Sequence, residues 1–172
     1  MTRALVFAVV STLAVWGGAG AAFAGIATGS AFTVKVQVVA GCSIVSPPGY
    51  TFTTTAGTSA APAAVRQAMS VTCSAGTPYQ IAFVSANDKD ATGVTKIMKG
   101  TKSGNADTIA YNLRAAGVNI GKQDGVNTIS ATGTGAAQAR NIRAVITTWI
   151  GSTGGRLTPD TYTDLVTARV DY

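Results

Sequence analysis

The chain contains no histidine and no glutamate, and its seven acidic residues are all aspartates. A histidine general base, a Ser-His-Asp triad and histidine metal ligands are therefore excluded. The Ser-x-x-Lys nucleophile pattern is also absent. Asp88 and Asp90 form the closest acidic pair, and we interpret the polar stretch around them as a solvated loop. These absences predict a protein that is not an enzyme and that has no cofactor and no metal ion.

Charged residues make up only 12% of the chain, and they leave a formal net charge of +6 at pH 7. A nucleic-acid-binding protein usually gathers its basic residues in one patch or stripe. Here they are interpreted as scattered along the sequence, at Lys35, Lys89, Arg114, Arg140 and Arg169. The charge pattern therefore predicts no nucleic-acid partner.

Two polar segments that contain glycine bear a weak resemblance to functional motifs. Lys96, Lys99 and Lys102 recur every third residue, but neighbouring glycines argue against a helix. We interpret this segment as a solvated basic connection, with weak attachment to an anionic surface as the alternative. The segment 133–135 has two glycines but lacks the lysine and the helix of a phosphate-binding loop, so we expect a flexible hairpin loop.

The first 24 residues have the features of a secretory signal peptide. Arg3 precedes an uncharged apolar stretch, and Ala22-Phe23-Ala24 provides a small-x-small cleavage site. We expect the mature protein to begin at Gly25. The alternative is a membrane anchor, but the apolar run is shorter than the ~20 residues that a spanning helix needs.

Cysteine is scarce, with only Cys42 and Cys73 in the whole chain. Metal-binding cysteines come in close pairs, so this spacing predicts no metal site. Export would carry both thiols into an oxidising compartment, where a disulfide between them is expected. Two buried free thiols remain the alternative.

The chain after the signal is rich in Thr, Val, Ala and Gly, which is typical of an all-β protein of one domain. Turn signals separate apolar stretches of strand length. The predicted strands are 31–39, 68–73, 79–85, 108–114, 118–121, 126–129, 141–150 and 162–172. Asp124-Gly125 predicts a tight hairpin between the fifth and the sixth of these strands.

Strict alternation of apolar and polar residues marks both ends of this array. Near the start, Phe32, Val34, Val36 and Val38 alternate with Thr33, Lys35 and Gln37. At the end, Val166, Ala168, Val170 and Tyr172 alternate with Thr167, Arg169 and Asp171. Each pattern predicts a strand with one buried face.

Several motifs together resemble the spore coat protein U domain family, which includes subunits of archaic chaperone-usher pili of the Csu type. They are Gly41-Cys42-Ser43-Ile44, the run 71–79 around Cys73, Ile109-Ala110-Tyr111-Asn112-Leu113, Tyr162-Thr163-Asp164, and the terminal Val170-Asp171-Tyr172. The resemblance spans most of the chain after the signal.

This resemblance implies an incomplete immunoglobulin-like β-sandwich of the pilin type, completed by a donated N-terminal strand. Residues 1–24 would be the signal, 25–40 a donor-strand extension and 41–172 the domain. Phe32, Val34, Val36 and Val38 would enter the groove of a neighbouring subunit, and Val166, Ala168, Val170 and Tyr172 would line the edge of the subunit's own groove.

The resemblance also implies the partners and the destination of the protein. The partners would be copies of itself or sister pilins, a periplasmic chaperone and an outer-membrane usher. The protein would pass through the periplasm to a surface fimbrium that supports adhesion or biofilm formation.

A second hypothesis is a self-contained secreted coat protein or carbohydrate-binding β-sandwich. In that case the first strand folds back into its own domain, and aromatic residues such as Tyr50, Tyr79 or Trp149 contact a ligand. A purified protein that is monomeric and stable without any partner would favour this second hypothesis.

Overall fold

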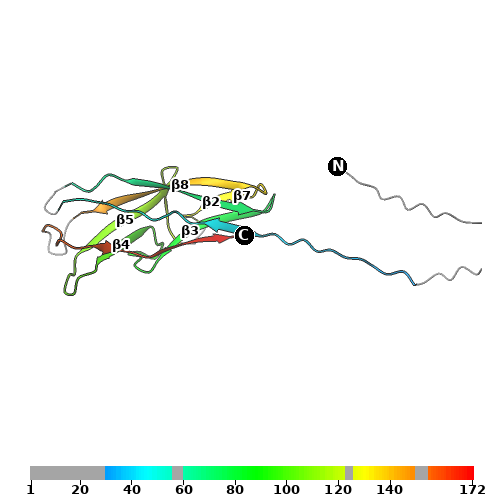
Figure 1. Ribbon diagram of the computed structural model, residues 1–172, viewed down its shortest axis with the longest axis horizontal. Coiled ribbons are helices and arrows are strands. Elements are labelled where there is room, and N and C mark those ends of the chain that lie inside the picture. Colours follow the sequence, from blue (N-terminus) through cyan, green and yellow to red (C-terminus); the bar gives the residue numbers. More distant parts are fainter. Residues whose placement is uncertain (1–29, 56–59, 123–125, 150–154) are drawn as a thin grey trace, which may run out of the picture. The chain divides into compact units, whose positions relative to one another are not determined.

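The computed structural model describes residues 30–55, 60–122, 126–149 and 155–172 (Figure 1). The expected signal peptide and the Asp124-Gly125 turn lie outside the described residues. Backbone contacts divide the chain into two units, 1–37 and 38–172, which are described separately. All the secondary-structure elements in the described part of the chain are β-strands.

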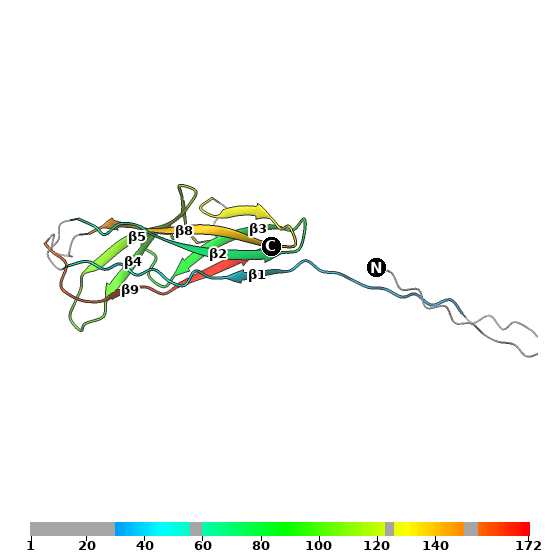
Figure 2. The same cartoon turned by 45° about the horizontal axis from the view of Figure 1, so that its top comes forward.

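The strands of the second unit form two antiparallel sheets that pack as a sandwich (Figures 1 and 2). The larger sheet has the order β1-β2-β8-β5-β4-β9, with β6 also paired to β5, and the smaller sheet has the order β10-β3-β7. The strands are β1 (Cys42–Val45), β2 (Val65–Cys73), β3 (Pro78–Ser85), β4 (Thr95–Gly100), β5 (Thr108–Ala115), β6 (Val118–Ile120), β7 (Ile129–Thr132), β8 (Ala137–Thr148), β9 (Tyr162–Thr163) and β10 (Val166–Asp171).

The core forms where the inward-facing side chains of the two sheets meet. In β8, Ile142 and Ala144 are buried while Arg143 between them is exposed. In β3 of the opposite sheet, Ile81 and Phe83 are buried. Removing each large apolar side chain from water stabilises the fold by about 1.5–3 kcal/mol, so these buried side chains explain why the two sheets stay together.

Strand β4 corrects the interpretation of residues 96–102 as a solvated basic connection. Thr95–Gly100 pair with β5 on one side and with β9 on the other. Lys96 is fully buried, whereas Lys99 is exposed. The lysines are three residues apart, whereas side chains of a β-strand return to the same face every two residues. The sequence pattern therefore did not indicate which lysine faces the core.

The predicted hairpin between 118–121 and 126–129 is wrong. Strand β6 pairs with β5, and β7 pairs with β3 in the other sheet. The hairpin that does form joins β5 to β6 through Ala116-Gly117, whose φ angles are 47° and 88°. Positive φ at both central residues is the signature of a type I′ turn, which suits the twist of a two-residue hairpin.

We expect Ala116→Asn to stabilise the domain by about 1 kcal/mol, because asparagine tolerates the left-handed conformation that costs alanine energy. Urea unfolding of the purified protein measures this change. Ala75→Asn is the matched control, since Ala75 is also exposed in a turn but has no positive φ. Equal effects of the two substitutions would contradict a conformational origin.

The glycine segment 133–135 is not the flexible hairpin loop expected from the sequence. It connects β7 in the smaller sheet to β8 in the larger one. The Gly133 N–H donates to the Thr77 carbonyl at 2.7 Å, and the Gly133 carbonyl accepts from the Gly76 N–H at 2.9 Å. A Cβ at Gly133 would lie 2.3 Å from the Ser74 carbonyl oxygen, so this close backbone approach requires glycine.

Candidate functional site

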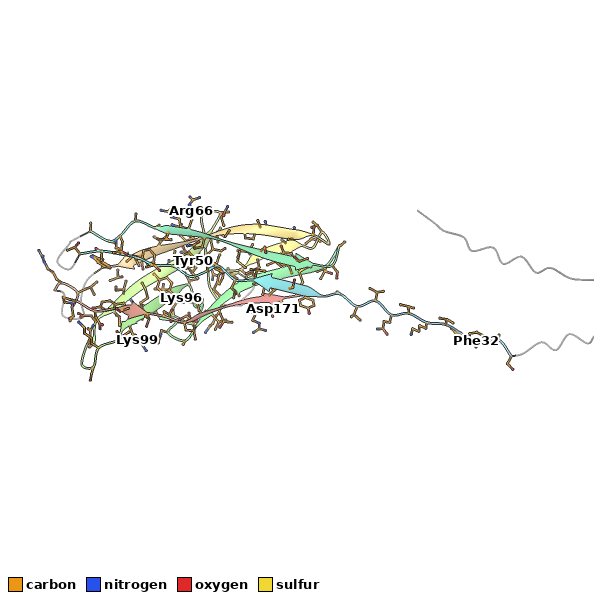
Figure 3. All side chains as sticks on the ribbon, in the orientation of Figure 1. Phe32, Tyr50, Arg66, Lys96, Lys99 and Asp171 are labelled. Atoms are coloured by element: carbon orange, nitrogen blue, oxygen red, sulfur yellow. A yellow bond between two sulfur atoms is a disulfide. The ribbon has the colours of Figure 1, made fainter. Side chains whose placement is uncertain are left out.

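The alternating segment near the start of the chain exposes its apolar side chains. Phe32, Val34 and Val36 are 87%, 80% and 82% exposed, and Val38 is 90% exposed. The segment, in which Figure 3 marks Phe32, contains no strand, contrary to the prediction of a strand over 31–39. Strand formation requires hydrogen bonds from a neighbouring strand, and none pairs with this segment among the described residues. The sequence pattern is that of a half-buried strand, and its apolar face is uncovered.

The chain is anchored directly after this segment. Cys42 and Cys73 form a disulfide with an S–S distance of 2.01 Å, which confirms the pairing expected for an exported chain. The two cysteines are cross-strand partners in β1 and β2. Gly41 accepts a hydrogen bond from the Ser74 N–H at 3.0 Å. The chain is therefore held to the second unit at residues 41–42.

Strand β10 leaves one edge of the smaller sheet unpaired. Within the described residues it pairs only with β3, and β1 lies beside it without a hydrogen-bonded ladder (Figures 1 and 2). Val166, Ala168 and Val170 are half-buried against the core, while Tyr172 lies just beyond the strand and is 63% exposed. An unpaired edge offers free N–H and C=O groups to another strand.

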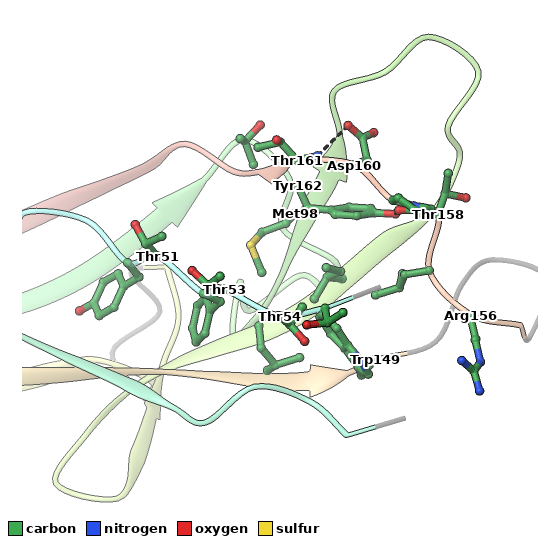
Figure 4. Close-up of a pocket in the computed structure, with 18 of the residues that line it drawn as sticks. Thr51, Thr53, Thr54, Met98, Trp149, Arg156, Thr158, Asp160, Thr161 and Tyr162 are labelled. Carbon is green, nitrogen blue, oxygen red and sulfur yellow. Dashed lines mark hydrogen bonds between the residues drawn. The ribbon is translucent and has the colours of Figure 1, made fainter. Parts of the chain in front are cut away.

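A pocket of about 870 Å³ opens into the core of the sandwich (Figure 4). Its apolar wall is made by Tyr50, Phe52, Met98, Ile109, Ile146, Trp149, Leu157 and Tyr162. Ile109 and Ile146 belong to the buried core, and the others are only partly buried against it. Part of the core is therefore accessible from the surface at this end of the domain.

Some of the residues that line the pocket directly precede, in the sequence, the strand that carries the free edge. Residues 155–163 line the pocket, and β10 begins at Val166. At the rim, the Asp160 carboxylate accepts hydrogen bonds from the Lys102 N–H, the Asn105 side chain and the Thr101 hydroxyl. Desolvation would raise the pKa of Asp160, but these hydrogen bonds together lower it to about 2, so the rim stays ionised.

Hydrogen bonds and burial fix the tyrosines of the site. The Tyr50 hydroxyl donates to the Ile142 carbonyl at 3.2 Å, and desolvation raises the pKa of Tyr50 to about 12. The Tyr162 hydroxyl donates to the Thr158 carbonyl at 2.8 Å. Tyr79 is only 2% exposed, so the expectation that it could contact a ligand as a surface aromatic is wrong.

A partly buried polar cluster ties β3 and β5 to the link between β9 and β10. The Asp164 carboxylate accepts hydrogen bonds from the Ser85 hydroxyl at 2.6 Å, the Asn87 amide at 3.0 Å and the Tyr111 hydroxyl at 2.6 Å. Ser85 ends β3 and Tyr111 lies in β5, so Asp164 connects both sheets. Desolvation and the hydrogen bond to Asp164 raise the pKa of Tyr111, which therefore stays neutral.

Lys96 lies in the same region, and its burial was not predicted from the sequence. Its Nζ is 3.7 Å from Asp88 Oδ1 and also donates to the Gly93 carbonyl. Burial lowers the pKa of Lys96, and the charges of Asp88 and Asp164 oppose that change. The Asp88 side chain is only 12% exposed, so it does not belong to a fully solvated loop as predicted.

The part of the chain that the structure describes offers neither a metal site nor a membrane-spanning helix. No group of three or more His, Cys, Asp or Glu side chains is arranged to hold a metal ion there. No helix in that part of the chain is long and apolar enough to cross a membrane. The features that stand out are the exposed alternating segment, the open pocket and the unpaired edge.

Comparisons with known proteins point in one direction. A family model described as the Spore Coat Protein U domain matches residues 28–169. A solved chain from the CsuC–CsuE chaperone–tip adhesion subunit pre-assembly complex, from the archaic chaperone-usher Csu pili of Acinetobacter baumannii, matches with a TM-score of 0.51 and 23% identity. The match covers 78% of the present chain and 40% of the solved chain, and it shows a shared fold. No protein with a curated description matches the sequence.

Proposed function

The chain belongs to the Spore Coat Protein U domain family, and from that premise we propose that it is a structural pilus subunit that polymerises by strand donation. The family resemblance and the all-β sandwich predicted from the sequence are both confirmed. The family and its matched structural neighbour are structural proteins, which agrees with a non-enzymatic role. The proposed route runs through the periplasm to the cell surface, with a chaperone, an usher and sister subunits as partners.

The observation that carries this proposal is the exposure of Phe32, Val34, Val36 and Val38. Burying four such side chains in a partner would give a gross hydrophobic gain of roughly 6–12 kcal/mol, before the cost of ordering the segment. The alternation places all four on one face of an extended strand. A segment of this kind is suited to strand addition, where backbone hydrogen bonds supply affinity and alternate side chains set the register.

The domain carries features that an acceptor would need. The free edge of β10 can hydrogen-bond a further strand, and the half-buried Val166, Ala168 and Val170 provide an apolar floor beside it. The pocket of about 870 Å³ gives an incoming side chain access to the core. Donor and acceptor features on one chain support a head-to-tail polymer, because a contact between different surfaces repeats without closing on itself. Adhesion or biofilm support would then be a property of the fibre.

We expect Val36→Asp to reduce assembly into fibres by at least about tenfold, because a carboxylate would have to enter an apolar groove unpaired. Lys35→Asp is the matched control, since its side chain points to the opposite face of the extended segment. Fibre yield, measured by electron microscopy and by the protein sheared from cells, checks both variants. Equal assembly of the two variants would contradict strand donation in this register.

A further inference from the structure

Three arginines form one row across the outer face of the larger sheet. Arg66 in β2 is the register partner of Arg143 in β8, and Arg143 is the register partner of Arg114 in β5. Arg66 and Arg143 are exposed, and Figure 3 shows Arg66 at the outer surface of the domain. The sequence interpretation of scattered basic residues is therefore wrong for this set. Arg66 and Arg143 are 77 positions apart in the sequence, yet they are register partners on adjacent strands.

This arginine row has no acidic partner among the described residues. The ion pairs in that part of the chain join Lys96 to Asp88 and Arg169 to Asp171. Arg114 donates from Nη2 to the Gly117 carbonyl at 2.7 Å, but its Nε has no hydrogen-bond partner. Like charges directly opposite each other destabilise a sheet. The row is thus a concentrated positive charge that no described acidic residue neutralises.

A hollow of about 600 Å³ lies over the arginine row. Arg140 also lines it and donates from Nη2 to the Tyr79 hydroxyl at 3.3 Å. The remaining lining residues are Ala115, Ala116, Gly117, Ile129, Ala139 and Asn141. None of them is aromatic, so the hollow offers charge and hydrogen-bond donors but no stacking surface for a base.

We propose that the arginine row binds an acidic polysaccharide through carboxylate or sulfate groups that recur along the polymer. Adjacent strands lie about 4.8 Å apart, so the row presents guanidinium groups at a regular short spacing. The guanidinium fork donates two parallel hydrogen bonds to a planar oxyanion, which lysine cannot do. Single-stranded nucleic acid is disfavoured because its binding sites combine charge with aromatic stacking. This proposal goes beyond the pilus-subunit function and does not depend on polymerisation.

The test compares the purified mature chain with two charge-matched variants. Arg66→Gln/Arg143→Gln removes two charges from the row and leaves the Arg114 contact with the β5–β6 turn intact. Lys89→Gln/Lys99→Gln removes two exposed charges elsewhere. Binding is measured to immobilised polygalacturonate for carboxylates, to dextran sulfate for sulfates, to neutral dextran and to single-stranded DNA, at several salt concentrations.

We expect the native protein to bind at least one of the two charged glycans and not neutral dextran. The row variant should bind at least about tenfold more weakly with a shallower salt dependence, because fewer counterions are released. The control variant should change by less than about twofold. The proposal is overturned if both variants lose affinity equally, if neither charged glycan is bound, or if DNA is bound more tightly than both glycans.

Discussion

A precursor that lacks residues 25–38 is expected to yield a folded, chaperone-bound domain that does not enter fibres. The disulfide, β1 and the whole sandwich follow the deleted segment, so the domain keeps its own core. What it loses is the set of four exposed apolar side chains, whose burial in a neighbour is the proposed source of subunit attachment. Fibres should fall below detection in electron micrographs of cells that make only this variant.

Two length-matched variants separate the loss of the apolar face from the loss of chain length. Replacing Phe32, Val34, Val36 and Val38 by serine should abolish fibres as the deletion does. Replacing Thr33, Lys35 and Gln37 by serine should leave them, because these side chains lie on the other face of the extended segment. Normal fibres from the deletion would rule out strand donation. A deletion protein and a native protein that are both stable monomers without a chaperone would favour the self-contained secreted domain.

The buried Lys96–Asp88 pair carries the largest expected effect on stability. Asp88→Ala should lower the free energy of unfolding by about 3–5 kcal/mol, because it leaves the fully buried Lys96 without its nearest carboxylate. The double variant Asp88→Ala/Lys96→Met should recover most of that loss, since no buried charge then remains to be compensated. Urea unfolding with the disulfide intact measures the free energy of unfolding of the native protein and of both variants.

Lys99→Met is the control for this comparison of the single and the double variant. Lys99 lies three residues along the same strand but is exposed, so its replacement should change stability by no more than about 0.5 kcal/mol. If the double variant were as unstable as Asp88→Ala, the loss would stem from local backbone contacts instead of the unpaired charge. The region has such contacts, since the Lys89 N–H donates to the Thr95 carbonyl and the Ile97 N–H donates to the Asn87 carbonyl.

The local sequence pattern was sufficient to predict those features that depend only on residues close together in the sequence. Alternation predicted the inward face of β10, because successive side chains of a strand point to opposite sides. It also marked Phe32, Val34, Val36 and Val38 as one apolar face. The pairing of Cys42 with Cys73 followed from there being only two cysteines in a chain that is expected to be exported. The Asp-Gly hairpin failed because a turn signal does not say which strands its flanks will join.

The sequence by itself determined the fold class, the disulfide, the family and the presence of an alternating segment with one apolar face near the start of the chain. Only the tertiary structure decided that this segment is uncovered and forms no strand, that Lys96 faces the core and that Arg66, Arg114 and Arg143 form one row. The physical reason is register. Which residues of distant strands lie opposite each other is set by packing of the whole sandwich, and a shift of one residue would turn each of these side chains to the other face.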